Sequence, residues 1–439
     1  MFRRNQKNWL PCTLLVLAVS SAGAKQASHS PLGEVSIPAL TSAAPAGVSL
    51  PTPLKQAFDA AWQRQPEAQS QQARQDAAEA RKQAAESWSA EPATLELSTK
   101  TDSLNRNQGS REVVAGVTIP LWLPGERSRT GAVADAERRV AASRVLAAQL
   151  RTAANVRESY WLWERARIEH DLARERLSNA QLLAVDVAKR VKAGDLARSD
   201  QHQADGAMAL AEVGLAEATG ALAVAVQRLR TQSGLVPIPT MPGMATESEP
   251  VPDVPADFEA LDIRHPAVAE ILDRAEVARR SAELAQVQTR ANPELTLATT
   301  RARGQFEEPY QQSITLGIRI PFGSDSRNQA KLATAQADTI EAEGQLSLER
   351  ERLRIDMGAA RVGLESARTQ LKASDRRLQL ARESRTFFLK SFRMGETDLP
   401  TRLRIELEAI DAERQAARAR IDLAAAISAL RQNLGLLPE

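Results

Sequence analysis

The sequence predicts an α+β membrane protein that arose by internal duplication, with β-hairpins at one end of very long helices. Three observations predict this fold class. Prolines, glycines and short motifs recur at an offset of about two hundred residues, which divides the chain into two similar copies. Each copy holds two segments in which apolar and polar residues strictly alternate, and each holds a long interval without proline. The period is too long for a stacked solenoid unit, so the two copies are expected to form pseudo-symmetric halves of a larger object.

The duplication extends from near the start of each copy to its end. Pro66 recurs as Pro266 at an offset of 200, and Gly194 recurs as Gly395 at an offset of 201. Further pairs keep the offset of 201: Pro92 with Pro293, residues 117–120 with 318–321, and residues 234–237 with 435–438. A constant offset leaves little room for insertions, which predicts repeat 1 over residues 52–235 and repeat 2 over residues 256–436.

The first 24 residues have the pattern of an export signal. Basic residues precede an apolar run over residues 10–19, and the small residues at 22–24 suit a signal peptidase. The run is too short to span a bilayer, so cleavage is expected in place of anchoring. Residues 25–51 then follow as an extended segment before repeat 1.

Composition narrows the class of protein. The signal carries Arg3, Arg4 and Lys7, so cleavage lowers the formal net charge of +2 by three, to −1, and leaves no net attraction to nucleic acid. Cys12 is the only cysteine and lies inside the signal, so a mature chain without thiol, disulfide or lipid is expected. No later stretch approaches eighteen uninterrupted apolar residues, so no transmembrane helix is expected. The exported chain is therefore periplasmic, secreted or a β-barrel in an outer membrane.

Proline placement predicts where the long helices run. Residues 125–236 and 322–399 contain no proline, whereas residues 236–255 contain six and are expected to link the repeats. A helix over 126–192 would be about 100 Å long at about 1.5 Å per residue, so it must belong to an elongated bundle or tube. Helices are then expected to return over about 197–233 and 400–434.

A heptad seam supports these helices. Apolar or small residues recur at alternating steps of three and four, as in packed coiled coils. The seam in repeat 2 comprises Met357, Ala360, Leu364, Ala367, Leu371, Ser374, Leu378 and Ala381. Its equivalent in repeat 1 comprises Val156, Ser159, Trp163, Ala166, His170, Ala173, Leu177 and Ala180.

Four segments alternate between apolar and polar residues, as membrane strands do. In repeat 1 they are residues 95–100 and 113–121, and in repeat 2 residues 295–297 and 313–322. About ten such residues can cross a bilayer as a tilted strand. Soluble, half-buried hairpins are the plainer alternative. In a membrane, four strands cannot close a barrel, because the smallest use about eight, so the barrel is expected to be shared between subunits.

The order of helix, hairpin, very long helix, tip and returning helix, present twice, resembles the TolC-like outer-membrane efflux channels. Residues 190–200 resemble the periplasmic tip motif of that family. The resemblance covers essentially the whole mature chain. It implies a homotrimer in the outer membrane of a Gram-negative bacterium, with a twelve-stranded barrel of four strands per subunit and a helical tunnel in the periplasm. It also implies a membrane-fusion adaptor and, through it, an inner-membrane pump of the RND type.

The second tip, residues 391–403, is most similar to the branch that serves cobalt-zinc-cadmium pumps. This similarity implies divalent heavy-metal cations as the substrate. Drug or small-molecule efflux and type I secretion remain alternatives within the same fold. A periplasmic adaptor would need many short strands, and a structural coiled-coil protein would leave the alternating segments unexplained.

The resemblance assigns roles to residues at the tips. Adaptor docking falls on Arg190, Gly194, Asp195, Leu196, Arg393, Gly395 and Leu399. Asp200 matches a position that helps to hold the tunnel end shut. The second tip departs from the family, because Thr401 and Arg404 stand where some members place aspartates. Glu396 and Asp398 are then the candidates for pore charge, and capping of the returning helix is the alternative.

Trp122, where a strand meets a helix, and Trp88, at the end of the preceding helix, are predicted to be membrane-interface anchors, with ordinary packing as the alternative. No metal site or other cofactor is expected. The histidines show no ligand spacing: they are His29, His170, His202 and His265. Catalytic and phosphate-binding motifs are absent as well, so an enzyme is not expected.

Overall fold

The computed structural model describes residues 52–105, 107–237, 248–253, 264–323 and 325–439. Several predicted features lie outside this part of the chain: the signal at 1–24 with Cys12, the extended segment at 25–51 with His29, most of the linker at 236–255, and the start of repeat 2.

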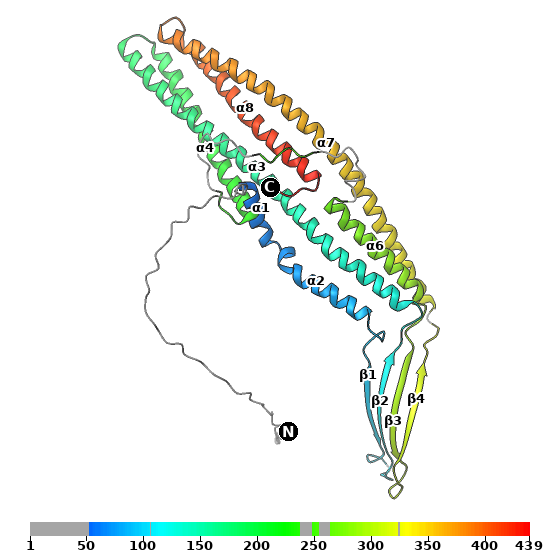
Figure 1. Cartoon of the computed structure of the whole chain (residues 1–439). Coiled ribbons are helices and arrows are strands. Elements are labelled where there is room, and N and C mark those ends of the chain that lie inside the picture. Colours follow the sequence, from blue (N-terminus) through cyan, green and yellow to red (C-terminus); the bar gives the residue numbers. More distant parts are fainter. Residues whose placement is uncertain (1–51, 106, 238–247, 254–263, 324) are drawn as a thin grey trace, which may run out of the picture. The chain divides into compact units, whose positions relative to one another are not determined.

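The first repeat begins with two short helices and a hairpin (Figure 1). Helix α1, Pro53–Arg64, starts where the Thr52 hydroxyl accepts a hydrogen bond of 3.2 Å from the Lys55 backbone N–H. Helix α2, Pro66–Ala85, is separate because a residue before proline favours extended backbone. Strands β1, Thr94–Thr101, and β2, Arg111–Pro120, follow.

The long helix of repeat 1 is continuous. Helix α3, Glu126–Ala193, has 68 residues, and α4, Arg198–Ser233, returns along it. Repeat 2 has the same order, with α6 at Pro266–Val287, β3 at Glu294–Arg303, β4 at Gln311–Arg319, α7 at Asp325–Arg393 and α8 at Leu399–Asn433. Helix α7 has 69 residues, so the predicted pair of very long helices is confirmed.

The four strands form one antiparallel sheet in the order β1-β2-β3-β4. The central pairing joins the repeats: β2 and β3 run in register from Arg111 opposite Arg303 to Pro120 opposite Glu294. This register aligns the apolar positions of neighbouring strands, since Val117 pairs with both Leu95 and Leu297, and Leu297 pairs with Leu316. The predicted alternation is confirmed, and the outer edges belong to β1 and β4.

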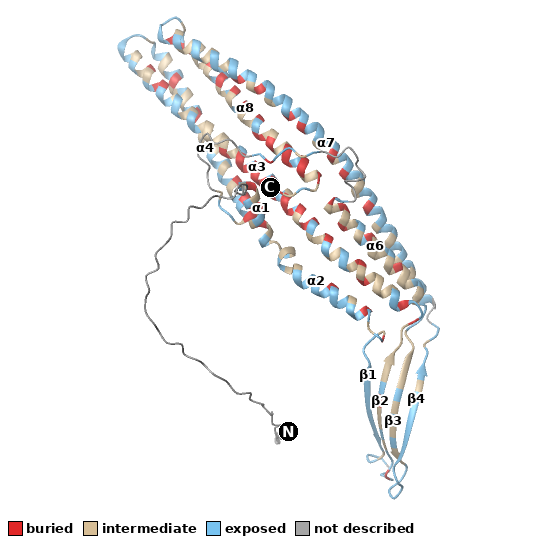
Figure 2. Ribbon diagram, viewed as in Figure 1, coloured by how far each residue is buried: buried red, intermediate tan, exposed pale blue. Residues whose placement is uncertain are grey.

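The hydrophobic core lies between α1, α3, α4 and α8. Figure 2 shows buried residues along α3 and α8, whereas much of α7 is exposed. At the centre, the Tyr160 and Trp161 rings meet edge to face, with centroids 5.1 Å apart and planes at 85°. Leu54 and Phe58 of α1 pack on the same cluster. Seam residues Val156 and Met357 are buried too, as the heptad pattern predicts.

By length and composition, one helix in the described part of the chain is apolar enough to cross a membrane. It is α4, which holds an 18-residue stretch of mean hydropathy 1.6 with only 11% of the stretch buried. Glu212 and Glu217 interrupt the apolar run, so the helix holds no eighteen uninterrupted apolar residues, while many alanines and valines keep the mean high. Leu210, Val213 and Val224 are more than half exposed in the single chain.

Candidate functional site

The two helical tips are built alike. At the end of α3, Gly194 has φ of +86°, and the Asp195 N–H donates to the Arg190 carbonyl at 2.9 Å. At the end of α7, Gly395 has φ of +81°, and the Glu396 N–H donates to the Ser391 carbonyl at 3.0 Å. This left-handed helix ending favours glycine, which explains why the sequence repeats a glycine there.

A shared apolar cluster joins the tips to each other. Val187 of α3 and Ala204 of α4 pack with Phe392 of α7 and Leu399 of α8, and none of the four is more than 2% exposed. The tips therefore behave as one packed unit within the chain, not as two independent hairpins.

Phe392 lies between two arginines that come from different tips. Its ring centroid is 5.0 Å from the guanidinium carbon of Arg190 and 4.6 Å from that of Arg402, which are distances typical of cation–π contacts. Burial lowers the pKa of Arg402, and the charges of Glu406 and Asp186 oppose that effect. Sequence reasoning missed this contact, although Phe392 is the one aromatic residue within three positions of either tip glycine.

The acids at the tips cap the returning helices. The Asp200 carboxylate accepts a hydrogen bond of 3.0 Å from the backbone N–H of Ala197, which precedes α4. Asp398 precedes α8 and accepts from the Thr401 N–H at 3.2 Å. A hydrogen bond from the Thr401 side chain is the main cause that lowers the pKa of Asp398, and the bond from the Thr401 backbone N–H lowers it further. Glu396 accepts from the Ser391 hydroxyl at 3.4 Å.

The predicted docking residues divide into exposed and buried groups. Gly194, Asp195, Arg393 and Gly395 are exposed, as a docking surface requires. Arg190 and Leu196 are partly buried, and Leu399 is 1% exposed because it fills the core between the tips. Leu399 therefore supports the shape of the tip from within.

At the other end of the long helices, the sheet has two different faces. One face is apolar and exposed, with Leu97 at 70%, Ile314 at 76% and Leu316 at 72% exposure. The other is polar, with Thr118 bonded to Thr296 and Arg319 paired with Glu294 at 3.3 Å. A sheet with an exposed apolar face is suited to lipid on that side and to water on the other.

The two predicted anchors flank the junction between sheet and helices. Trp88 is 68% exposed. Trp122 is partly buried, and its indole N–H donates to the Ser87 carbonyl at 3.1 Å, which ties the end of α2 to the start of α3. The hydrogen bond gives Trp122 a structural role within the chain, whereas the side chain of Trp88 is exposed.

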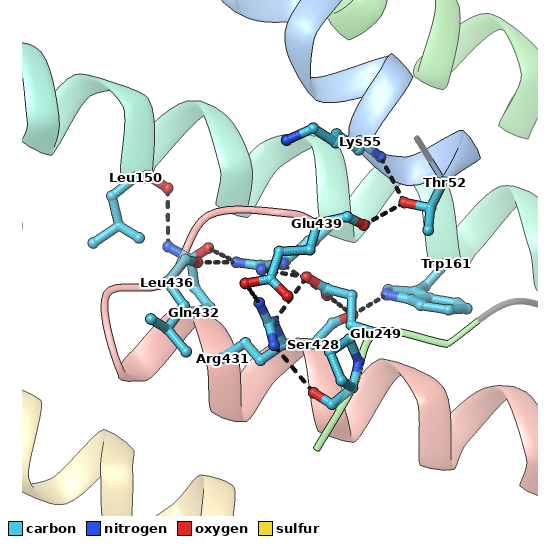
Figure 3. Close-up of polar contacts among 12 residues, drawn as sticks. Thr52, Lys55, Leu150, Trp161, Glu249, Ser428, Arg431, Gln432, Leu436 and Glu439 are labelled. Carbon is cyan, nitrogen blue, oxygen red and sulfur yellow. Dashed lines mark hydrogen bonds and ion pairs between the residues drawn. The ribbon is translucent and has the colours of Figure 1, made fainter. Parts of the chain in front are cut away.

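A buried ionic cluster lies halfway along the helices (Figure 3). Glu249, in the segment between the repeats, pairs with Arg157 of α3 at 2.6 Å and with Arg431 of α8 at 3.2 Å. Ser428 bonds to Glu249 and accepts from the Trp161 indole N–H at 2.9 Å. Removing Glu249 would leave the buried guanidinium of Arg157 without its carboxylate partner, and breaking a buried ion pair in this way typically costs about 3–5 kcal/mol. The sequence did not predict this ionic cluster, because a carboxylate in a proline-rich linker carries no local sign of burial.

Among the described residues, no group of three or more histidines, cysteines or acids is placed to hold a metal ion. His170 is partly buried, with its Nδ1 atom 3.4 Å from the Asp171 carboxylate, and His202 is exposed on α4.

Comparisons with known proteins agree with this geometry. Residues 57–235 match the outer membrane efflux protein family. The chain is 29% identical over 252 residues to the cobalt-zinc-cadmium resistance protein CzcC of Cupriavidus metallidurans, a match that covers 56% of this chain and 59% of that protein. The chain thus spans less than two thirds of the curated relative it matches.

Solved channel structures share the fold. The structure of CusC superposes with a TM-score of 0.72 at 18% identity, covering 87% of this chain and 92% of that one. The outer membrane protein VceC of Vibrio cholerae gives a TM-score of 0.69 at 17% identity, covering 88% and 97%. The MtrE outer membrane channel of Neisseria gonorrhoeae gives 0.71 at 17%, covering 87% and 89%. The chain thus has the fold of these outer-membrane channels across most of its length, and its first repeat matches the outer membrane efflux protein family.

Proposed function

We propose that the chain is one subunit of a trimeric outer-membrane channel in a tripartite efflux system, and that three copies close a twelve-stranded barrel. The observation that carries this proposal is the four-stranded sheet with one apolar, exposed face and free edges at β1 and β4. Free edges are not tolerated in lipid, because their backbone groups find no hydrogen-bond partner there. Pairing β4 of one copy with β1 of the next satisfies both edges.

The helices support the same assembly. Leu210, Val213 and Val224 of α4 are 55%, 55% and 69% exposed, and Val362 of α7 is 72% exposed. So much exposed apolar surface is unusual in a protein that works as a monomer. Neighbouring subunits would cover it and complete the wall of the tunnel.

The tips are the proposed contact with the rest of the efflux system. Gly194, Asp195, Arg393 and Gly395 are exposed at the end of the helices farthest from the sheet (Figure 1). A periplasmic membrane-fusion adaptor would bind there and connect the channel to an inner-membrane pump of the RND type. Asp200 would help to keep the tunnel end closed at rest.

For the substrate we propose divalent heavy-metal cations. The similarity to CzcC supports this substrate class. Three copies of Glu396 and Asp398 around the axis would also raise the local concentration of cations through their summed potential. Drug efflux and protein secretion are the alternatives within the same channel function.

Mass measurement of the detergent-solubilised protein tests the assembly. A trimer is expected, and a stable folded monomer would contradict the shared barrel.

Deletion of the gene tests the substrate: cells should become sensitive to zinc, cobalt, nickel or cadmium more than to hydrophobic drugs. Sensitivity to dyes or detergents without any change in metal tolerance would contradict the metal assignment and leave the channel in place.

A charge-removing variant tests the cation entrance. In Glu396→Gln with Asp398→Asn, cation conductance in a planar bilayer should fall, most of all at low salt, where charges are least screened. Glu365→Gln, which removes an exposed acid paired with Arg368 near the middle of α7, serves as the control because it removes the same charge away from the tips.

A further inference from the structure

Three arginines stand together on the apolar face of the sheet, at its loop end. Arg111 of β2 is directly opposite Arg303 of β3, and Arg301 is opposite Val113 on the same face. Residues on this face toward the helices are apolar or threonine, among them Leu297 and Ile314. The arginines therefore mark the outer boundary of the apolar band.

In the described part of the chain, these three positive charges stand close together without a paired carboxylate. Like charges directly opposite each other destabilise a sheet. Within the described residues, no ion pair joins any of the three to a carboxylate. Glu112 is opposite Lys100 and Ala302, on the other face. The carboxylate of Glu308 accepts hydrogen bonds from two backbone N–H groups of its own loop, at 3.0 Å and 3.2 Å.

The guanidinium groups are held in place despite their repulsion. The Tyr310 ring centroid is 4.8 Å from the guanidinium carbon of Arg301 and 4.9 Å from that of Arg303. The Arg303 Nε–H donates to the Gly109 carbonyl at 3.0 Å, and the Phe306 N–H donates to the Gln108 carbonyl at 3.0 Å. These contacts join the two hairpin loops and hold Arg301 and Arg303 in place before any ligand arrives.

Their height along the strands fits the headgroup region of a membrane. From Val113 to Ile119 the apolar face of β2 spans about 20 Å at about 3.3 Å per residue. Apolar bands of membrane barrels are about 25 Å tall, and arginine on the lipid face is costly at the midplane but nearly neutral near the interface. Tyrosine is also enriched at that level.

We propose that Arg111, Arg301 and Arg303 bind the phosphate groups of a glycolipid in the leaflet on the loop side of the sheet. Guanidinium groups bind phosphate oxygens through paired N–H donors, and a lipid would supply its phosphates at this height while its acyl chains cover Leu297 and Ile314. The site rests on the lipid-facing orientation of the sheet proposed above, and it is independent of what the channel exports.

Native mass spectrometry of the detergent-extracted protein tests the site, with lipid A as the probe and lipid A lacking both phosphates as its counterpart. The test variant is Arg111→Gln with Arg301→Gln, which keeps the bond from Arg303 to Gly109. The matched control is Lys100→Gln, one residue pair away along the strands and on the opposite face. Particle mass and heat-modifiable migration verify that both variants assemble.

The wild type and Lys100→Gln should bind lipid A equally, and the double variant should bind it at least about tenfold more weakly, since hydrogen bonds to charged groups are the stronger class. Equal binding of the lipid without phosphates would overturn the proposal, as would unchanged binding by the double variant. Displacement of lipid A by an equal concentration of inorganic phosphate would make the site a general anion site. The two-lipid comparison needs only the wild type, so it decides the question even if the double variant does not assemble.

The outcomes also separate this site from the channel itself. A wild-type protein that never assembles into a membrane particle contradicts the barrel. An assembled trimer that binds both lipids alike contradicts only the phosphate site.

Discussion

Arg190 of α3 and Phe392 of α7 connect the tips of the two repeats, with the guanidinium carbon 5.0 Å from the ring centroid. They are about two hundred residues apart in the sequence. Because the ring is also covered by Arg402 and is only 2% exposed, the relative position of the two tips depends on it.

Replacing Phe392 should loosen the tips. Phe392→Ala removes a buried ring, a change that costs about 3–5 kcal/mol, whereas Phe392→Leu keeps most of the burial and loses cation–π contacts of about 0.5–2 kcal/mol. Single-channel conductance and protease cleavage at the tips should both rise, more in Phe392→Ala than in Phe392→Leu. Phe387→Ala is the control, because Phe387 is 68% exposed on the same helix. An equal rise in conductance and cleavage in Phe387→Ala and Phe392→Ala would show that Phe392 does not hold the tips together.

The tip glycines should tolerate alanine better than proline. Nothing lies within 4 Å of a Cβ added at Gly194 or Gly395, so alanine meets only the strain of positive φ, about 1–2 kcal/mol. Proline cannot adopt that φ, and it removes the N–H that Gly194 donates to Val191.

Either proline variant should abolish efflux while the protein stays in the membrane fraction. Gly206→Ala in α4, also open around its Cβ, is the control and should stabilise the helix by up to about 1 kcal/mol. Full efflux with both turns replaced by proline would show that the tips are not the docking surface.

Two substitutions at Asp200 separate its possible roles. Asp200→Ala removes both the charge and the bond to Ala197, and conductance should rise as charge-assisted contacts of a few kcal/mol at most are lost. Asp200→Asn removes the charge but keeps an oxygen that can cap α4. If closure depends on charge, the asparagine variant conducts like the alanine variant. Wild-type conductance in the asparagine variant would leave capping as the role.

The cap at Asp398 should weaken in acid. Its pKa is lowered by the hydrogen bond from Thr401, so the stabilisation is fully present above the unfolded value of about 3.9 and is lost as the pH falls through the lower, folded value. The protection factor of the Thr401 amide, which corrects its exchange rate for the intrinsic effect of pH, should therefore stay high from neutral pH to about pH 4 and fall below it. Asp398→Asn should remove this pH dependence, and a wild-type profile that is flat to pH 2 would contradict it.

Local patterns were sufficient to predict the elements of the fold. The constant offset and the alternation around Val117 and Ile318 predicted the strands, and the glycines at 194 and 395 marked both tips. The pairing of Phe392 with Arg190 and the burial of Glu249 were not predictable, because each depends on partners from distant segments. Leu399 was expected on the docking surface but is buried, since an apolar residue at the start of a helix looks the same in sequence whether it points outward or inward.

The register between β2 and β3 has a consequence for how such a chain can evolve. Their pairing, from Arg111 opposite Arg303 to Pro120 opposite Glu294, turns what would be a contact between two identical half-length chains into a contact within one chain. Once the two halves are fused into one chain, equivalent positions in the halves are free to diverge. A substitution then occurs three times in a trimer, whereas it would occur six times in an assembly of six identical half-length chains. The aspartate at 200 and the threonine at 401, equivalent by the offset of 201, are an example of that freedom.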